Sequence, residues 1–203
     1  MHKCCKAAGI KSEAKHYKYK KPGVAGKVFP NLLLSELQID GPLQCIVSDM
    51  TAFRVKGVYY ELTLYMDLWN NEIVSHSLSS KRGDRMTYIS GLKELLELKK
   101  QYPEYQMILH SDQGSVYASK AYNDLLPMYV TRSMSRAGTP TDNGAMESIN
   151  GWIKAELFMD FHVTGDRPVE TEIDEYITFF NEQRPAYALN YLTPKQYRET
   201  YAP

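Results

Sequence analysis

The 203-residue chain is long enough for one domain with a buried core and a terminal arm. Its hydrophobic fraction is ordinary for a globular protein, and no apolar run approaches the roughly 20 residues that cross a bilayer, so we expect no membrane partner. Three Cys residues without a C-x-x-C pair argue against a disulfide scaffold and against a zinc ribbon.

The net charge is zero but unevenly distributed. Residues 1–27 contain eight Lys and one Glu, a net of +7, so the rest of the chain carries −7. A basic arm on a mildly acidic body is typical of a tail that binds a polyanion, although a solvated Lys-rich terminus without a specific role has the same composition. The arm lacks the apolar stretch of a secretory signal, and we therefore expect a cytoplasmic protein.

Hydrophobic periodicity predicts an α/β chain in which strands come first and helices dominate the end. Three strands joined by short links favour an antiparallel meander, and two later helices can act as crossovers onto a mixed sheet. A short helix over 2–9 is also conceivable within the basic arm. The predicted strands cover 44–50, 57–68, 72–78, 105–110 and 129–134, and the predicted helices 85–100, 119–126, 145–158, 169–183 and 193–201.

Three acidic residues occupy unusual places in this pattern. Asp49 is expected at the end of the first strand, Asp112 at the end of the fourth, and Glu147 in the first turns of the helix after the fifth. In a sheet of order 3-2-1-4-5 the first and fourth strands are neighbours, so their carboxyl ends bring the two Asp residues side by side. Converging carboxylates without a basic partner suit Mg²⁺ or Mn²⁺, and two such ions can catalyse phosphoryl transfer.

A less specific interpretation of the same residues stays open at this point. A strand-end Asp often serves only as a turn former or a helix cap. Asp67, which also ends a predicted strand, competes with Asp49 by position alone.

Longer motifs carry a resemblance to a known family. The segments "HSDQGSVY" (110–117), "SMSRAGTPTDNGAMESINGWIKAE" (133–156) and "YITFFNEQRPAYALNYLTPKQYRE" (176–199) together resemble the OrfB-type transposases of bacterial insertion sequences. The catalytic core of these transposases is similar to that of retroviral integrases and has a ribonuclease H-like fold. The resemblance implies an acidic (DDE) triad at Asp49, Asp112 and Glu147, and it places Asp67 in the sheet rather than in the triad.

The resemblance also implies a domain organisation and partners. Residues 1–29 resemble the remnant of a helix-turn-helix region, and residues 30–203 an integrase-like catalytic core with C-terminal helices. We then expect a transposase that uses two Mg²⁺ or Mn²⁺ ions to hydrolyse a phosphodiester and to join the freed 3′-hydroxyl to another. The implied partners are the DNA of the element ends and of the target, further copies of the chain on DNA, and an upstream-frame helix-turn-helix protein. The active protein is expected on the bacterial nucleoid.

Four polar residues near the triad are expected to bind DNA. Asn150 and Lys154 lie three and seven residues after Glu147 and share its helix face, while Arg132 and Arg136 flank the segment "SMS". The alternatives are a solvated helix face for Asn150 and Lys154, and ion pairs with surface acids for the two Arg residues.

Two further functions remain as alternatives to the transposase. The 34 residues between Asp112 and Glu147 are one fewer than the family usually has, which motivates a catalytically inactive remnant that only binds DNA. A nuclease acting on RNA–DNA hybrids would share the same acidic site.

Overall fold

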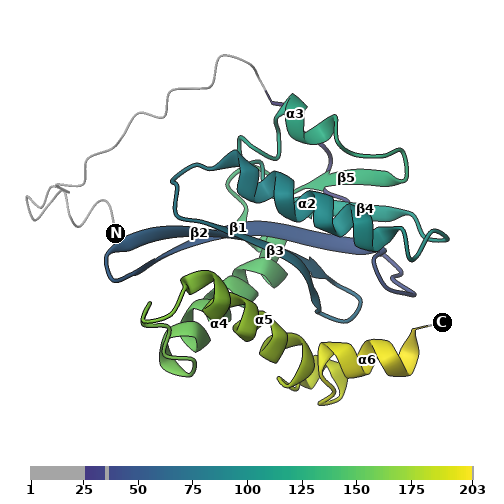
Figure 1. Ribbon diagram of the computed structural model, residues 1–203. Helices are drawn as coiled ribbons and strands as arrows, with labels where there is room; N and C mark the ends of the chain where they lie inside the picture. Colours follow the sequence, from purple (N-terminus) through teal and green to yellow (C-terminus); the bar gives the residue numbers. More distant parts are fainter. Residues whose placement is uncertain (1–25, 35–36, 203) are drawn as a thin grey trace, which may run out of the picture.

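A five-stranded sheet lies between two layers of helices in the computed structural model, which describes residues 26–34 and 37–202 (Figure 1). The helix expected over 2–9 and nearly all of the basic arm therefore fall outside the described residues. The strands are β1 (Cys45–Val55), β2 (Val58–Asp67), β3 (Ile73–Ser79), β4 (Met107–Ser111) and β5 (Val130–Met134).

The strand order is β3-β2-β1-β4-β5, which confirms the expected order 3-2-1-4-5. The first three strands form an antiparallel meander, whereas β4 runs parallel to β1 and β5 runs parallel to β4. The prediction that the first strand stops near residue 50 is wrong, because β1 continues through a hairpin in which Val55 pairs with Val58. Lys56 and Gly57 both have positive φ, 48° and 82°, as a tight two-residue hairpin turn requires.

Helices cover both faces of this sheet (Figure 1). They are α2 (Arg85–Lys99), α3 (Lys120–Asn123), α4 (Gly144–Met159), α5 (Val169–Glu182) and α6 (Pro194–Tyr201), with 3₁₀ turns at Pro140–Asn143 and Tyr187–Leu189. The side chain of Asp84 caps α2, since it accepts a hydrogen bond from the backbone N–H of Met86. The helix predicted over 119–126 is shorter than expected and amounts to a single turn. No helix in the described ranges is both long and apolar enough to span a membrane.

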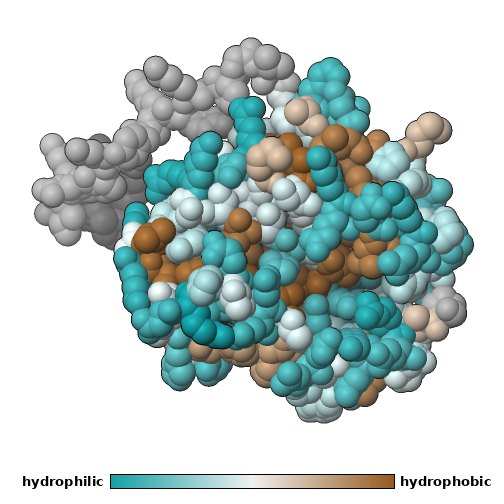
Figure 2. All heavy atoms as spheres, viewed as in Figure 1, coloured by the Kyte–Doolittle hydropathy of each residue, from teal (hydrophilic) through white to brown (hydrophobic). Residues whose placement is uncertain are grey.

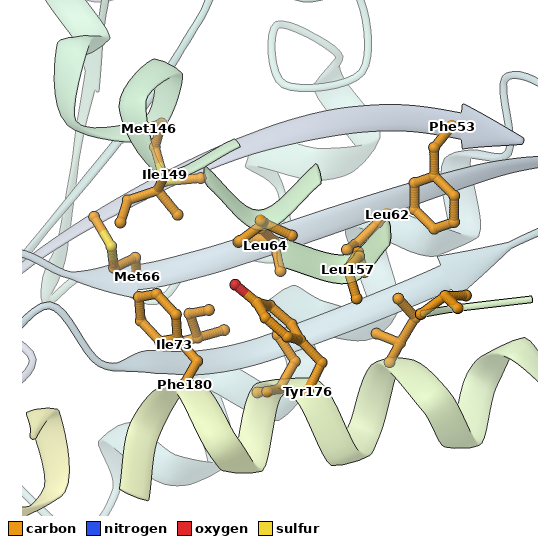
Figure 3. Packing of buried hydrophobic residues seen from close by; sticks show 14 of the residues in the cluster. Phe53, Leu62, Leu64, Met66, Ile73, Met146, Ile149, Leu157, Tyr176 and Phe180 are labelled. Carbon is orange, nitrogen blue, oxygen red and sulfur yellow. The ribbon is translucent and has the colours of Figure 1, made fainter. Parts of the chain in front are cut away.

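The core on one face of the sheet joins β1 and β2 to α4 and α5 (Figure 3). Leu62, Leu64 and Met66 point from β2 toward α5, where Tyr176 and Phe180 are buried against them. Four α4 residues spaced along one helix face are also buried here, as the periodicity predicted: Met146, Ile149, Ile153 and Leu157. Packing of this apolar face fixes how α4 lies across the sheet.

The opposite face carries a second core with an unusual number of tyrosines. Leu92 and Leu95 of α2 are fully buried, together with Tyr65, Tyr117 and Tyr122. Buried tyrosine hydroxyls need hydrogen-bond partners; Tyr65, for example, donates to the backbone oxygen of Tyr88 at 2.8 Å and lies 3.0 Å from the hydroxyl of Tyr122. Polar and charged residues cover most of the outer surface seen in Figure 2, with smaller apolar areas between them.

Asp67 is a buried carboxyl that connects the segment before β1 to the segment after β2. Only 1% of the residue is exposed, and its oxygens accept hydrogen bonds from the backbone N–H groups of Leu43 (2.7 Å) and Trp69 (3.0 Å). Burial raises the pKa of this carboxyl from 3.8 to about 7. Asp67 therefore has a structural role at the start of β1 and the end of β2.

Replacing Leu64 by Ala should lower the free energy of unfolding by about 2–5 kcal/mol, because the residue is fully buried between β2 and α5. Urea denaturation followed by circular dichroism measures the loss. Leu125→Ala is the matched control, since that Leu is 38% exposed and its truncation should cost less than about 0.5 kcal/mol. Equal losses in the two variants would contradict the packing described above.

Asp67 should make the protein less stable as the pH rises from about 4 to about 7. The folded state holds a proton on this carboxyl up to a pKa of about 7, while the unfolded state releases it near 3.8, so the folded state binds more protons in this window. The contribution falls by at most about 1.4 kcal/mol per pH unit and is constant above pH 7. Asp67→Asn should remove this slope, and urea denaturation of both proteins at several pH values measures it. Parallel profiles for the two proteins would show that Asp67 is ionised throughout.

Candidate active site

Asp49 lies inside β1 and next to the point where β1 stops pairing with β4. The parallel register ends at Ser48 opposite Ser111, so Asp49 and Asp112 are the next residues on two neighbouring strands. The expectation that Asp49 ends its strand is corrected, because β1 continues beyond it along β2. The expected neighbourhood of the two acids is nevertheless present, since it depends on the β1–β4 register.

The loop after β4 turns tightly around Asp112. The carboxylate of Asp112 is exposed, and its Oδ1 accepts a hydrogen bond from the backbone N–H of Gly114 at 2.8 Å. A Cβ atom at Gly114 would lie only 2.8 Å from the same oxygen, so any larger residue there would displace the carboxylate. Gln113 connects this loop to the residue after β5, because its Nε2 donates to the backbone oxygen of Ser135 at 2.9 Å.

The two carboxylates act on the same neighbour. The pKa of the Tyr88 hydroxyl is raised, first by burial and then by the negative charges of Glu61, Asp112 and Asp49. Because charge effects of this kind fall with distance, the shift places Asp49 and Asp112 in one electrostatic neighbourhood.

Helix α4 brings further polar groups to this neighbourhood. Asn150 is 7% exposed, and its Nδ2 donates a hydrogen bond to Oδ2 of Asp49 at 2.9 Å. Its Oδ1 is buried and finds no hydrogen-bond partner in the described part of the chain. The backbone of Glu147 lies in α4 one turn before Asn150, whereas its side chain lies outside the described residues. Asn150, predicted to contact DNA, thus contacts an acid of the predicted triad.

Two of the four predicted DNA contacts are exposed. Lys154 lies on the surface one turn beyond Asn150. The side chain of Arg136 is 61% exposed, but its Nε and Nη2 donate to the carboxylate of Asp142 at 2.9 and 2.8 Å. These hydrogen bonds hold the pKa of Asp142 well below its usual range. The sequence does not single out Asp142, because an acid six residues after an Arg in a Gly- and Pro-containing segment is too weak a pattern.

Arg132 is buried, whereas the sequence predicted it at the surface, in contact with DNA or with surface acids. The residue is 5% exposed, and its guanidinium donates to the backbone oxygen of Leu109 and to Oγ of Ser111, each at 2.9 Å. The side chain points to the tyrosine-rich core because the strand alternation of β5 turns it there, with its guanidinium 5.4 Å from the Tyr122 ring centre. In this position Arg132 supports the end of β4 instead of offering its charge to DNA.

His110 is a hydrogen-bonded core residue. It is fully buried, and its two ring nitrogens lie 2.8 and 3.0 Å from the hydroxyls of Ser133 and Ser135. Burial, reinforced by the charge of Arg132, lowers the pKa of His110 to about 4. The imidazole is therefore neutral at pH 7, with both nitrogens engaged.

The donor atoms present are compatible with a hard divalent cation. Asp49 and Asp112 offer carboxylate oxygens, the ligands that Mg²⁺ and Mn²⁺ prefer. A search of the described side chains, which do not include that of Glu147, finds no group of three His, Cys, Asp or Glu residues that could hold a metal. Asp49 and Asp112, two of the predicted ligands, directly follow the last residue pair of the β1–β4 register.

Comparison with known proteins agrees with this geometry. The family described as Integrase core domain matches residues 128–194. A putative transposase for insertion element IS150 of Escherichia coli K12 is 34% identical over 185 residues, covering 89% of this chain and 64% of the relative. The transposase for insertion element IS904 of Lactococcus lactis is 32% identical over 195 residues, covering 94% of this chain and 76% of the relative.

Solved structures show the same fold at lower identity. A chain of the simian T-cell lymphotropic virus intasome superposes with a TM-score of 0.66 at 18% identity, covering 90% of this chain and 60% of that chain. The integrase catalytic core domain of HTLV-2, solved with magnesium, gives a TM-score of 0.60 at 18% identity. The match covers 78% of this chain and 97% of that chain. The sheet and its helices thus form the ribonuclease H-like fold of integrase cores. The chain belongs to the insertion-sequence transposases that have a retroviral-integrase-like catalytic core.

Proposed function

We propose that this chain is the catalytic part of a bacterial insertion-sequence transposase that cuts and joins DNA with the help of divalent metal ions. The observation that carries the proposal is the β1–β4 register, which ends one residue before both Asp49 and Asp112. Asn150 adds a third element, because its bond to Asp49 brings α4 to the same place, one turn from Glu147. The family resemblance assigns the catalytic and metal-binding roles to these three acids.

The carboxylates would hold the metal and so organise the reaction. When bound there, two Mg²⁺ or Mn²⁺ ions would supply activation of an attacking oxygen and stabilisation of the leaving oxygen of a phosphodiester. In the first reaction the attacking group is water at the end of the element, and in the second it is the freed 3′-hydroxyl. The HTLV-2 catalytic core named above was solved with magnesium, which supports this cofactor.

Positive side chains beside the acids would hold the DNA backbone. Lys154 is exposed on the face of α4 that carries Asn150, and Arg136 is exposed at the start of the loop before α4. We propose phosphate contacts for both, and DNA of the element ends and of the target as the substrates. We also propose that this chain acts as an oligomer on DNA.

The remaining parts of the expected organisation belong to the same proposal. We propose that residues 30–203 form the catalytic core, that residues 1–29 derive from a helix-turn-helix region, and that an upstream-frame helix-turn-helix protein is a partner. The place of action is the bacterial nucleoid.

The shortened path from Asp112 to Glu147 bears on the alternative of an inactive DNA-binding remnant. After the single turn of α3 the chain enters β5 without another helix. The five β4–β5 pairs, from Met107 opposite Val130 to Ser111 opposite Met134, are unbroken. The shorter link therefore leaves the register of β5 intact, which favours an active site over the remnant.

Replacing Asp112 by Asn or Glu147 by Gln should abolish metal-dependent strand transfer and leave DNA binding within about twofold, because each change removes a metal ligand and adds no bulk. A joining assay with element-end DNA and a filter-binding assay measure the two properties. Asp124→Asn is the control, since this exposed carboxylate pairs only with the neighbouring Lys120 in the described structure. Normal joining by the Glu147 variant would refute the triad, and binding without joining by the unmodified chain would favour the remnant.

Lys154→Ala should weaken binding of DNA of any sequence and reduce the slope of log K against log salt by about 1, as expected for one lost phosphate contact. Binding is measured by fluorescence anisotropy between about 50 and 200 mM salt. Lys93→Ala is the matched control, because Lys93 is equally exposed but lies on α2, across the sheet. An unchanged salt slope for the Lys154 variant would remove this residue from the interface.

A further inference from the structure

Hydrogen bonds on the α2 side of the sheet connect the two strands that carry the predicted catalytic acids. Oγ of Ser48 lies 2.7 Å from the hydroxyl of Tyr117, and both residues are buried, at 0% and 1% exposure. Ser48 directly precedes Asp49 in β1, and Tyr117 belongs to the loop that begins with Asp112. This single bond therefore links the backbone beside one acid to the loop of the other.

A second connection reaches the backbone of Asp112 itself. The guanidinium of Arg132 donates to Oγ of Ser111, whose hydroxyl in turn donates to the backbone oxygen of Asp112 at 2.9 Å. A further bond from Arg132 holds the backbone oxygen of Leu109 two residues earlier. The last residues of β4 are thus held from the side of the sheet opposite to α4.

Burying the guanidinium of Arg132 in this way lowers the stability of the fold. No salt bridge is found for its guanidinium among the described residues, and its buried Nε has no hydrogen-bond partner there. The rings of Phe29 and Tyr122 face the guanidinium, with centres 5.7 and 5.4 Å away, and the charge of Asp112 also acts on it. A buried cation that forms no ion pair is destabilising compared with an apolar side chain of similar volume. Stability alone therefore does not account for an Arg at this position.

We propose that Tyr117 and Arg132 are positioning residues that fix the separation of Asp49 and Asp112 for metal binding. The inference rests on the proposed function, because it concerns the same two acids. Side chains alternate along a strand, so Ser48 is held in the tyrosine core while Asp49 faces α4. Mg²⁺ demands ligands at 2.0–2.1 Å in near-ideal geometry, and a small shift between the two strands is therefore felt as lost metal affinity.

Tyr117→Phe tests the first connection, because it removes one hydroxyl and keeps the ring. We expect the Mn²⁺ concentration for half-saturation to rise by about tenfold, measured by electron paramagnetic resonance with the metal alone. The joining rate at saturating Mn²⁺ should stay close to normal. Ser48→Ala should shift Mn²⁺ binding in the same direction, and the double variant should bind Mn²⁺ no more weakly than Ser48→Ala, since the Ser change already removes the bond to Tyr117.

Tyr122→Phe is the matched control. It removes a hydroxyl from the same buried core, but this hydroxyl bonds to Tyr65 and does not touch the strands at Asp49 or Asp112. Thermal unfolding should be similar for the two variants, while only Tyr117→Phe should alter Mn²⁺ binding. Arg132→Lys, which keeps the charge and loses the paired donors, should shift Mn²⁺ binding in the same direction as Tyr117→Phe.

The outcomes separate this inference from the function on which it rests. If the unmodified chain binds no Mn²⁺, or binds it equally well after Asp112→Asn, the metal site itself is wrong and both proposals fall. If Asp112→Asn abolishes binding but Tyr117→Phe behaves as Tyr122→Phe does, only the positioning role is overturned. A Tyr117→Phe defect at low Mn²⁺ that saturating metal restores supports the role.

Discussion

The parallel pairing of β1 with β4 is the constraint on which the rest of the structure depends. Parallel neighbours need a crossover, and α2 provides it by carrying the chain from the edge strand β3 over one face of the sheet to β4. The pairing ends at Ser48 and Ser111, so the residues that follow reach the same edge from two strands far apart in sequence. Asp49 and Asp112 are neighbours for this reason alone.

The two faces of the sheet hold the residues at that edge by different interactions. On one face, the apolar stripe of α4 packs on β1 and β2, and this packing turns Asn150 toward Asp49. On the other face, tyrosines and Arg132 form a polar network within a core of leucines. The hydrogen bonds of this network hold Ser48 and the end of β4 against fixed partners, Tyr117 and Arg132. The site is thus packed from the α4 side and hydrogen-bonded from the α2 side.

Electrostatics separates the structural acids from the candidate catalytic ones. Asp67 is buried, accepts two backbone hydrogen bonds and has a pKa raised by burial, whereas Asp112 is exposed at the end of its strand. Asp142 forms a salt bridge with Arg136, and this interaction lowers the pKa of the Asp142 carboxyl. Of the two acids that compete by sequence position, Asp49 and Asp67, only Asp49 lies next to the end of the β1–β4 pairing.

The sequence by itself predicted where most strands and the main helices lie, and these follow from periodicity, capping residues such as Asp84 and short-range patterns, all of which are local. It also led us to the sheet order, and the resemblance to a family named candidate residues for the site. Only the tertiary structure decided that β1 continues past Asp49, that Arg132 is buried and that Asn150 bonds to Asp49. The extension of β1 depends on its pairing with β2, as between Phe53 and Tyr60. The other two depend on partners far along the chain, with Leu109 23 residues from Arg132 and Asn150 101 residues from Asp49. A local pattern cannot encode which distant strand or helix will lie opposite a given side chain.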